Sequence, residues 1–135
     1  MDTATRTVML EASRHSDLGD QSFGQIVKEL MAAGVERYHQ DFVRAERVYY
    51  MPNGETEVVQ HHLLATTPPD TFSEPDVIAP LRAVQAGTIK YIEFCEQIAA
   101  AGCVGYMVSI AGKRVTYYGR TGDSYTEWFP GAKPN

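Results

Sequence analysis

The sequence has few cysteines, no long apolar run and no excess of basic residues. Cys95 and Cys103 are its two cysteines. Because they have no second pair and no nearby histidine, they fit neither a zinc site nor a CxxC redox motif, and we interpret both as reduced structural thiols. No stretch approaches the roughly 18 apolar residues of a membrane span, and residues 1–20 lack the apolar core of a signal peptide. These absences favour a cytoplasmic protein with no membrane partner.

The charge balance and the missing motifs exclude further classes. Twelve Lys and Arg residues stand against seventeen Asp and Glu residues, which gives a net charge of -5. Because a net negative charge opposes association with the phosphate backbone, we predict no nucleic-acid partner. The sequence contains no GxGxxG, GxxxxGK[ST], GxSxG or HExxH motif, so the dinucleotide, P-loop, hydrolase and zincin classes lack their defining residues. We expect no cofactor.

Two segments of the chain repeat each other at a distance of about 68 residues. Residues 22–64 match residues 88–130, most clearly in an Ala-Ala-Gly-x-x-x-Tyr pattern. After Tyr38 and Tyr106, we align the two segments with one residue missing from the second segment. The original offset of 68 residues is restored at Gly54 and Gly122. The aligned identities are Ala32, Ala33, Gly34 and Tyr38 with Ala100, Ala101, Gly102 and Tyr106, then Arg47, Val48 and Tyr50 with Arg114, Val115 and Tyr117, and finally Gly54 with Gly122.

Each segment opens with the pattern of an amphipathic helix. Ser22 and Gln25 are spaced as a capping box, and Gly34 and Gly102 stand where a helix would end. We therefore expect helices at residues 22–33 and 88–101. Apolar residues recur at i, i+3, i+4, i+7 and i+8 in both, at Phe23, Ile26, Val27, Leu30 and Met31 and at Tyr91, Phe94, Cys95, Ile98 and Ala99.

After each helix the apolar period falls to two, which predicts strands. Turn residues separate three such runs in each segment. Each unit therefore has the order helix, strand, strand, strand, and the two units pair into one antiparallel sheet of about six strands with the helices on one face, an α+β fold. The expected strands are residues 38–43, 47–51, 56–63, 104–110, 114–118 and 124–129.

The remaining segments connect or flank the two units. Residues 65–87 form a linker that begins as a Pro- and Thr-rich loop and contains a short helix, which kinks at Pro80 or begins near it. For residues 1–20 we predict a loosely attached arm or a weak helix, and for residues 131–135 a frayed tail. The whole chain, residues 1–135, is long enough for one domain with its own core.

The repeated blocks also resemble a known bacterial family. The stretches GVERYHQDFVRAERVYYMPNGE and YIEFCEQIAAAGCVGYMVSIAGKRVTYYGRTGD are similar to the YdfO-like family, whose function is unknown and whose members occur in bacteria and prophages, often labelled phage envelope protein. The resemblance covers nearly all of residues 22–130 and implies an α+β domain of a bacterial or prophage-related protein. It implies no reaction and no catalytic residues. We take the envelope label as an inherited name.

His39 and Asp41 share one face of the first expected strand, because residues two apart on a strand point to the same side. His61 and His62 lie on the third expected strand, and one of them would approach this pair if the strands are neighbours. Such a set would form a metal site or an acid–base pair, whereas a solvated strand face is the commoner reason for the pattern. We predict no metal ion and keep His39 and Asp41 as candidate catalytic residues.

The tyrosines are more informative, because most of them fall on expected strands. Alternation sends one ring of the pair Tyr49 and Tyr50, and one ring of the pair Tyr117 and Tyr118, to each face of the sheet. Aromatic rings with a polar tip suit a ligand groove or a self-association surface, and pairs that only stabilise the sheet are the alternative. The predicted binding residues are Tyr38, Tyr49, Tyr50, His61, Tyr106 and Tyr117.

These observations favour a binding or interaction module without catalysis. The aromatic sheet face, or the cleft between the two halves, would hold a small molecule, an unidentified protein or a second copy of the chain. Bacterial effector-binding domains built from duplicated helix-and-sheet units bind ligands in such clefts, an analogy at the level of the fold. Open sheet edges favour a homodimer. The alternatives are a small acid–base enzyme that uses His39 and Asp41 with tyrosine hydroxyls, and a phage-derived inhibitor of a basic host protein.

Overall fold

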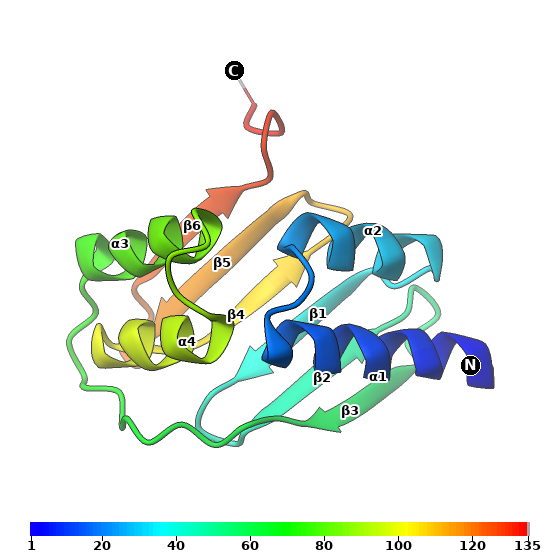
Figure 1. The fold of residues 1–135 in the computed structure, drawn as a ribbon, viewed down its shortest axis with the longest axis horizontal. Helices are drawn as coiled ribbons and strands as arrows, with labels where there is room; N and C mark the ends of the chain where they lie inside the picture. Colours follow the sequence, from blue (N-terminus) through cyan, green and yellow to red (C-terminus); the bar gives the residue numbers. More distant parts are fainter. Residues whose placement is uncertain (135) are drawn as a thin grey trace.

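Four helices cover one face of a six-stranded antiparallel sheet in the computed structural model, which describes residues 1–134 (Figure 1). The strand order is β3-β2-β1-β4-β5-β6, so the central pair β1 and β4 joins the two halves. The predicted α+β class is therefore confirmed. The helices are α1 (Thr3–Leu18), α2 (Phe23–Ala32), α3 (Glu74–Gln85) and α4 (Tyr91–Ala100), and the strands are β1 (Arg37–Asp41), β2 (Glu46–Tyr50), β3 (Thr56–Gln60), β4 (Cys103–Ser109), β5 (Arg114–Gly119) and β6 (Ser124–Trp128).

The duplicated unit is longer than the sequence suggested. Most residues with a positive φ fall into pairs that are 68 residues apart. One pair, Gly19 and Gly87, directly follows α1 and α3, so these two helices correspond. Each half therefore has the order helix, helix, strand, strand, strand. The pairs are Gly19 with Gly87, Gly34 with Gly102, Ala45 with Lys113, and Gly54 with Gly122.

The strand register shows which residues of the two halves correspond. The cross-strand pairs match at the same offset of 68 residues throughout. The one-residue deletion inferred from the sequence is therefore wrong, and Arg47 corresponds to Val115 rather than to Arg114. The matching pairs are Tyr38–Tyr49 with Tyr106–Tyr117, and Gln40–Arg47 with Val108–Val115.

The N-terminal segment is a packed helix, so of the two alternatives expected for residues 1–20 the helix is correct and the loosely attached arm is wrong. The Asp2 side chain caps α1, and Met9 and Ala12 are almost completely buried in the core. Ser13 on the same face is also buried. Because small and polar side chains make up most of this buried stripe, the apolar periodicity of α1 is weak in the sequence.

Other boundaries agree with the sequence or shift by a few residues. Ser22 Oγ accepts a hydrogen bond from the Gln25 amide at the start of α2, as predicted. The helix α3 begins at Glu74, and Pro80 lies inside it rather than in its first turn. The strand β3 ends at Gln60, so His61 follows the strand and is not part of it.

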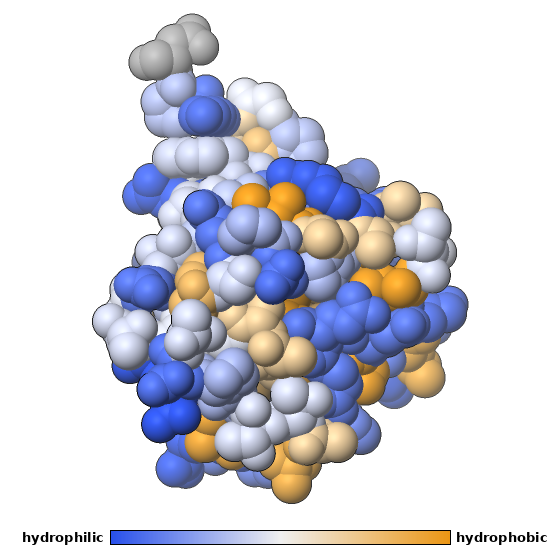
Figure 2. All heavy atoms as spheres, turned by 90° about the vertical axis from the view of Figure 1, so that its left-hand side faces the viewer, coloured by the Kyte–Doolittle hydropathy of each residue, from blue (hydrophilic) through white to orange (hydrophobic). Residues whose placement is uncertain are grey.

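The core lies between the helices and the sheet. The predicted alternation of the tyrosine pairs is confirmed: Tyr49 and Tyr117 are buried beneath the helices, whereas Tyr50 and Tyr118 lie on the uncovered face and are partly exposed. On the side of the molecule seen in Figure 2, apolar residues form scattered patches among hydrophilic ones. Within residues 1–134, none of the helices combines the length and the apolar content that crossing a membrane requires.

Candidate functional site

A cleft of about 880 Å³ lies where the two halves meet. The turn that joins α1 to α2 and the turn that joins α3 to α4 both line it, and three core tyrosines of the sheet contribute to its floor. Figure 1 shows both turns near the middle of the helical layer, above the central strands. The cleft therefore follows the pseudo-twofold axis that relates the halves. The three sheet tyrosines are Tyr38, Tyr106 and Tyr117.

One wall of the cleft is apolar. Phe23 at the start of α2 packs edge to face against Phe129, with ring centroids 5.6 Å apart. Leu81 of α3 and Val115 of β5 complete this wall. Since Val115 corresponds to Arg47, the second half has a short side chain at a position where the first half has a long one. The missing side-chain volume leaves room for the cleft on this side.

Tyrosine hydroxyls provide polar groups on the floor. Within residues 1–134, the hydroxyls of Tyr38 and Tyr117 form no hydrogen bond with another side chain or the backbone. Burial raises the pKa of both residues well above the ordinary value of 10.0. Both side chains are therefore neutral phenols at neutral pH, and each can donate a hydrogen bond to a molecule in the cleft.

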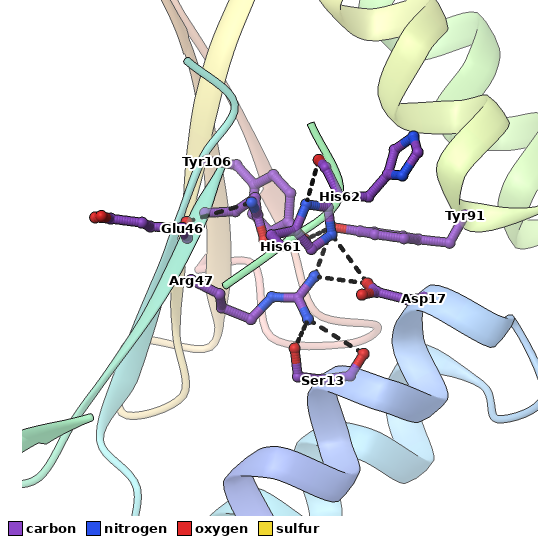
Figure 3. A network of polar contacts seen from close by, with 9 residues as sticks. Ser13, Asp17, Glu46, Arg47, His61, His62, Tyr91 and Tyr106 are labelled. Carbon is purple, nitrogen blue, oxygen red and sulfur yellow. Dashed lines mark hydrogen bonds and ion pairs between the residues drawn. The ribbon is translucent and has the colours of Figure 1, made fainter. Parts of the chain in front are cut away.

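A cluster of polar side chains lies beside the cleft, around the buried guanidinium of Arg47 (Figure 3). Arg47 Nη1 donates to Ser13 Oγ at 2.7 Å, and Arg47 Nη2 donates to Tyr91 Oη at 2.9 Å. The same Nη2 lies 3.5 Å from Asp17 Oδ1. Burial by itself lowers the pKa of Arg47, but the surrounding tyrosine and Asp17 oxygens hold it well above its ordinary value. The guanidinium therefore stays charged.

His61 is the second buried member of this polar cluster. Its Nε2 atom lies 2.9 Å from Asp17 Oδ1, and its Nδ1 atom lies 3.1 Å from the carbonyl oxygen of His62. Figure 3 shows the His62 ring pointing away from the cluster. Burial by itself raises the pKa of Asp17, but the hydrogen bond with His61 and the charge of Arg47 lower it overall. Asp17 is therefore the carboxylate that both basic side chains share.

In the other half of the molecule, the positions that correspond to the polar cluster hold apolar residues, except for the exposed Gln85. The edge-to-face contact of His61 with Tyr91, at 5.9 Å, recurs as the contact of Phe129 with Phe23 at 5.6 Å. The fold thus accepts apolar residues at these positions. Burying charged side chains costs desolvation free energy. Packing alone therefore does not explain why the first half has polar residues at these positions. The corresponding residues are Ser13 and Leu81, Asp17 and Gln85, Gln40 and Val108, Arg47 and Val115, His61 and Phe129, and Tyr91 and Phe23.

A hydrogen bond between two tyrosines connects the polar cluster to the cleft. Tyr91 Oη lies 2.5 Å from Tyr106 Oη. Both residues line the cleft, whereas Arg47 lies behind them. Burial raises the pKa of Tyr91 and of Tyr106 above 10.0. Two consecutive hydrogen bonds, through the neutral hydroxyls of Tyr91 and Tyr106, therefore link the charged guanidinium of Arg47 to the cleft.

Comparison with protein families gives a match over most of the chain. A family model described as a protein of unknown function, DUF1398, matches residues 20–127. The chain belongs to this family. The matched DUF1398 segment contains most of the cleft lining and Arg47, whereas all of α1, with Ser13 and Asp17, precedes it. None of the curated proteins matches the chain.

The DUF1398 domain brings together several of the predicted binding residues. Tyr38, Tyr106 and Tyr117 line the cleft, and His61 lies in the adjoining polar cluster. Two other predicted residues lie elsewhere. Tyr49 is buried beside Tyr38, with ring centroids 5.3 Å apart, and Tyr50 stacks under Arg37 on the uncovered sheet face.

His39 and Asp41 lie on the uncovered face of this domain, opposite the cleft. The His39 Nε2 atom is 2.5 Å from the Tyr118 hydroxyl, and burial lowers the pKa of His39. Asp41 Oδ1 accepts hydrogen bonds from the backbone amides of Val43 and Arg44, so it stabilises the β1–β2 turn. His61 lies on the helix side of the sheet and His62 lies near Glu96 of α4, so the set of His39, Asp41 and one of His61 or His62 considered from the sequence does not assemble within residues 1–134.

The sequence reasoning missed four residues of the polar cluster. They are far apart along the chain and come together only through packing. A signal for one of them was present, because the constant offset of 68 residues places Arg47 opposite a valine. The alignment with a deletion concealed this difference by matching Arg47 to another arginine. The missed residues are Ser13, Asp17, Arg47 and Tyr91.

Proposed function

We propose that this protein is a non-catalytic module that binds a small organic molecule in the cleft between its two halves. The observation that carries this proposal is the cleft itself, which has a volume of about 880 Å³ and lies on the pseudo-twofold axis. Ligand sites in proteins usually have volumes of about 300–1,000 Å³ and combine apolar walls with a few convergent polar groups. The apolar wall around Val115 and the tyrosine hydroxyls of the floor provide this combination.

Fluorescence titration with phenylnaphthylamine, a neutral aromatic amine that brightens in apolar surroundings, tests the proposal. The variant Val115→Phe extends a side chain from the apolar wall into the cleft. A larger residue is compatible with this position because Arg47 occupies the corresponding one. Lost apolar contact of about 60 Å² weakens binding roughly tenfold at about 25 cal/mol per Å². We expect the dissociation constant of the Val115→Phe variant to rise at least that much.

The matched control is Val58→Phe, which makes the same change on the uncovered face of β3, where Val58 is half exposed. This variant is expected to bind phenylnaphthylamine like the wild type. Circular dichroism spectra and thermal unfolding of both variants check that the fold is retained. Equal binding by the wild type and Val115→Phe, or no binding by the wild type, would contradict the proposal.

Self-association is a separate part of the proposal. The edge strands β3 and β6 each leave one side of their backbone without a neighbouring strand within the described chain. Such edges are often covered by a second copy through a twofold axis. A homodimer therefore remains a prediction, and sedimentation equilibrium tests it by the mass in solution. Membership of the YdfO-like group, a prophage origin and a cytoplasmic location also remain predictions.

A further inference from the structure

The direction of the hydrogen bonds around Tyr91 leaves one proton free in the cleft. Arg47 Nη2 is a donor, so Tyr91 Oη accepts from it at 2.9 Å. The single proton of Tyr91 is then available for Tyr106 Oη, which lies 2.5 Å away. Either hydroxyl of this pair can donate; with Tyr91 as the donor, Tyr106 keeps its own proton, and residues 1–134 show no other hydrogen bond of the Tyr106 hydroxyl. Because Tyr106 lines the cleft, its proton is available to a bound molecule.

The chain from Arg47 makes Tyr106 a stronger donor than an isolated phenol. Consecutive hydrogen bonds polarise one another, and the first donor in this chain carries a full positive charge. Tyr38 and Tyr117 add two further hydroxyl donors to the same floor. Lys90 lies at the turn that borders the cleft and adds a positive charge near it.

The acidic side chains of the cleft already have partners. Glu127 accepts hydrogen bonds from Arg82, and Asp20 lies 2.7 Å from His15 Nδ1. Among the described residues that line the cleft, Gln21 Oε1 is the buried acceptor atom without a partner. The tyrosine hydroxyls and Lys90 can therefore donate to acceptor oxygens of a molecule in the cleft, because the carboxylates of the lining already have partners of their own.

We propose that the molecule bound in the cleft is an aromatic or other flat apolar compound that carries an anionic oxygen group, a carboxylate or a sulfonate, and that this group binds the Tyr106 hydroxyl. Tyr91 and Arg47 act as positioning residues, because they orient and polarise Tyr106 and do not touch the ligand oxygen themselves. This inference rests on the proposed function, since it requires a ligand in the cleft. It explains why the half that contains Arg47 keeps a buried polar cluster where the other half is apolar.

Two fluorescent probes with the same aromatic body test the inference at pH 7. Anilinonaphthalene sulfonate differs from phenylnaphthylamine by one sulfonate group. We expect the wild type to bind the sulfonate more tightly than the neutral amine. A hydrogen bond to a charged group changes affinity by about 10- to 100-fold. In Tyr106→Phe, the dissociation constant of the sulfonate is therefore expected to rise about tenfold or more, while that of the neutral amine stays within about twofold.

The variant Tyr91→Phe tests the role of the chain from Arg47. Phenylalanine suits this position because Phe23 occupies the corresponding one. The change removes no donor to the ligand, yet it separates Tyr106 from Arg47, so we expect the sulfonate to bind about three- to tenfold more weakly and the neutral amine to bind normally. The control is Tyr118→Phe on the opposite face of the sheet, where neither dissociation constant is expected to change.

The possible results separate the two proposals. If neither probe binds the wild type, or if Val115→Phe binds the neutral amine as the wild type does, the proposed function fails and the inference fails with it. If the neutral amine binds in the cleft but the sulfonate binds no more tightly, or if Tyr106→Phe weakens both probes equally, the inference alone is overturned. Sulfonate binding that Val115→Phe leaves intact occurs outside the cleft and also contradicts the inference.

Discussion

The ring of Tyr118 on β5 reaches across the neighbouring strand β4 and stacks on His39 of β1, with 5.8 Å between the ring centroids. This contact depends on Gly105 of β4, which lies in register between Asp41 and Tyr118. A Cβ atom at Gly105 would lie 2.8 Å from the Tyr118 hydroxyl and 2.4 Å from the carbonyl oxygen of Gln40. The glycine therefore makes room both for the ring and for the close approach of two strands.

The first prediction concerns this glycine. In Gly105→Ala the side chain of Tyr118 can move away, but the backbone of Gln40 cannot, so the contact between β1 and β4 must distort. We expect the free energy of unfolding in urea to fall by about 2–3 kcal/mol. The control is Gly24→Ala in α2, where no atom lies within 4 Å of the added Cβ. This variant is expected to gain about 0.5 kcal/mol of stability. Equal stability of the two variants would contradict the prediction.

Local patterns in the sequence were sufficient to predict the sheet, the helices α2 and α4, and a short helix within residues 65–87 that corresponds to α3. The helix α2 combines an apolar stripe with a capping serine and a terminal glycine, and its counterpart α4 repeats the stripe. The strands alternate clearly between buried and exposed residues. For α1 the sequence indicated only a loose arm or a weak helix, because its buried face includes Ser13 and Ala12, whose burial depends on the partner that α1 packs against.

The candidate site was predictable only in part. The tyrosines of the floor were identified because alternation places them in the core. The polar cluster was not, because Asp17, Arg47, His61 and Tyr91 come from four separate elements whose contact depends on the tertiary fold. His39 and Asp41 were correctly placed on one face of a strand, but which face the helices cover cannot be deduced from the alternation alone.

The second prediction concerns the pH dependence of stability through Glu127. The hydrogen bonds from Arg82, with smaller contributions from Tyr125 and Gln85, lower the pKa of Glu127 from 4.5 to about 2. A carboxyl group whose pKa is lowered on folding stabilises the protein above its unfolded pKa, and this contribution is lost as the pH falls towards the folded pKa. Because Arg82 is half exposed, we expect a contribution of about 1 kcal/mol at pH 7.

Urea unfolding of Glu127→Gln against the wild type measures this contribution. The difference in the free energy of unfolding should be constant above about pH 5 and should shrink between pH 4.5 and about 2. Val58→Phe, which changes no titratable group, is the control, and its difference from the wild type should not change over this range. A Glu127→Gln difference that is independent of pH would show that the ion pair with Arg82 is not formed in solution.

The third prediction concerns the two cysteines, which are both buried and unpaired. Burial raises the pKa of Cys95 to about 12 and that of Cys103 to about 11, so neither forms an appreciable amount of thiolate at pH 8. Iodoacetamide should therefore leave both thiols unmodified in the folded protein and alkylate both in urea. The variant Ser124→Cys provides an exposed thiol as a positive control. Rapid alkylation of Cys95 or Cys103 in the folded protein would contradict the buried positions.

The last prediction tests whether the polar cluster exists for stability. Replacing Arg47 alone by alanine leaves the buried His61 and the partly exposed Asp17 without the guanidinium, and we expect a loss of about 3 kcal/mol in urea unfolding. Replacing the whole cluster by the residues of the other half should give a cooperatively folded protein within about 2 kcal/mol of the wild type, because those residues already pack at the equivalent places. The combined substitutions are Ser13→Leu, Asp17→Gln, Gln40→Val, Arg47→Val, His61→Phe and Tyr91→Phe.

The contrast between these two variants gives the decisive information. If the combined variant folds while Arg47→Ala is severely destabilised, the cluster contributes no net stability, and its presence needs another reason. The combined variant should then also lose the preference for the sulfonate probe over the neutral amine, because no charge remains behind Tyr106. If the combined variant fails to fold while Arg47→Ala is tolerated, the two halves differ in what their packing requires, and the argument from their correspondence no longer holds.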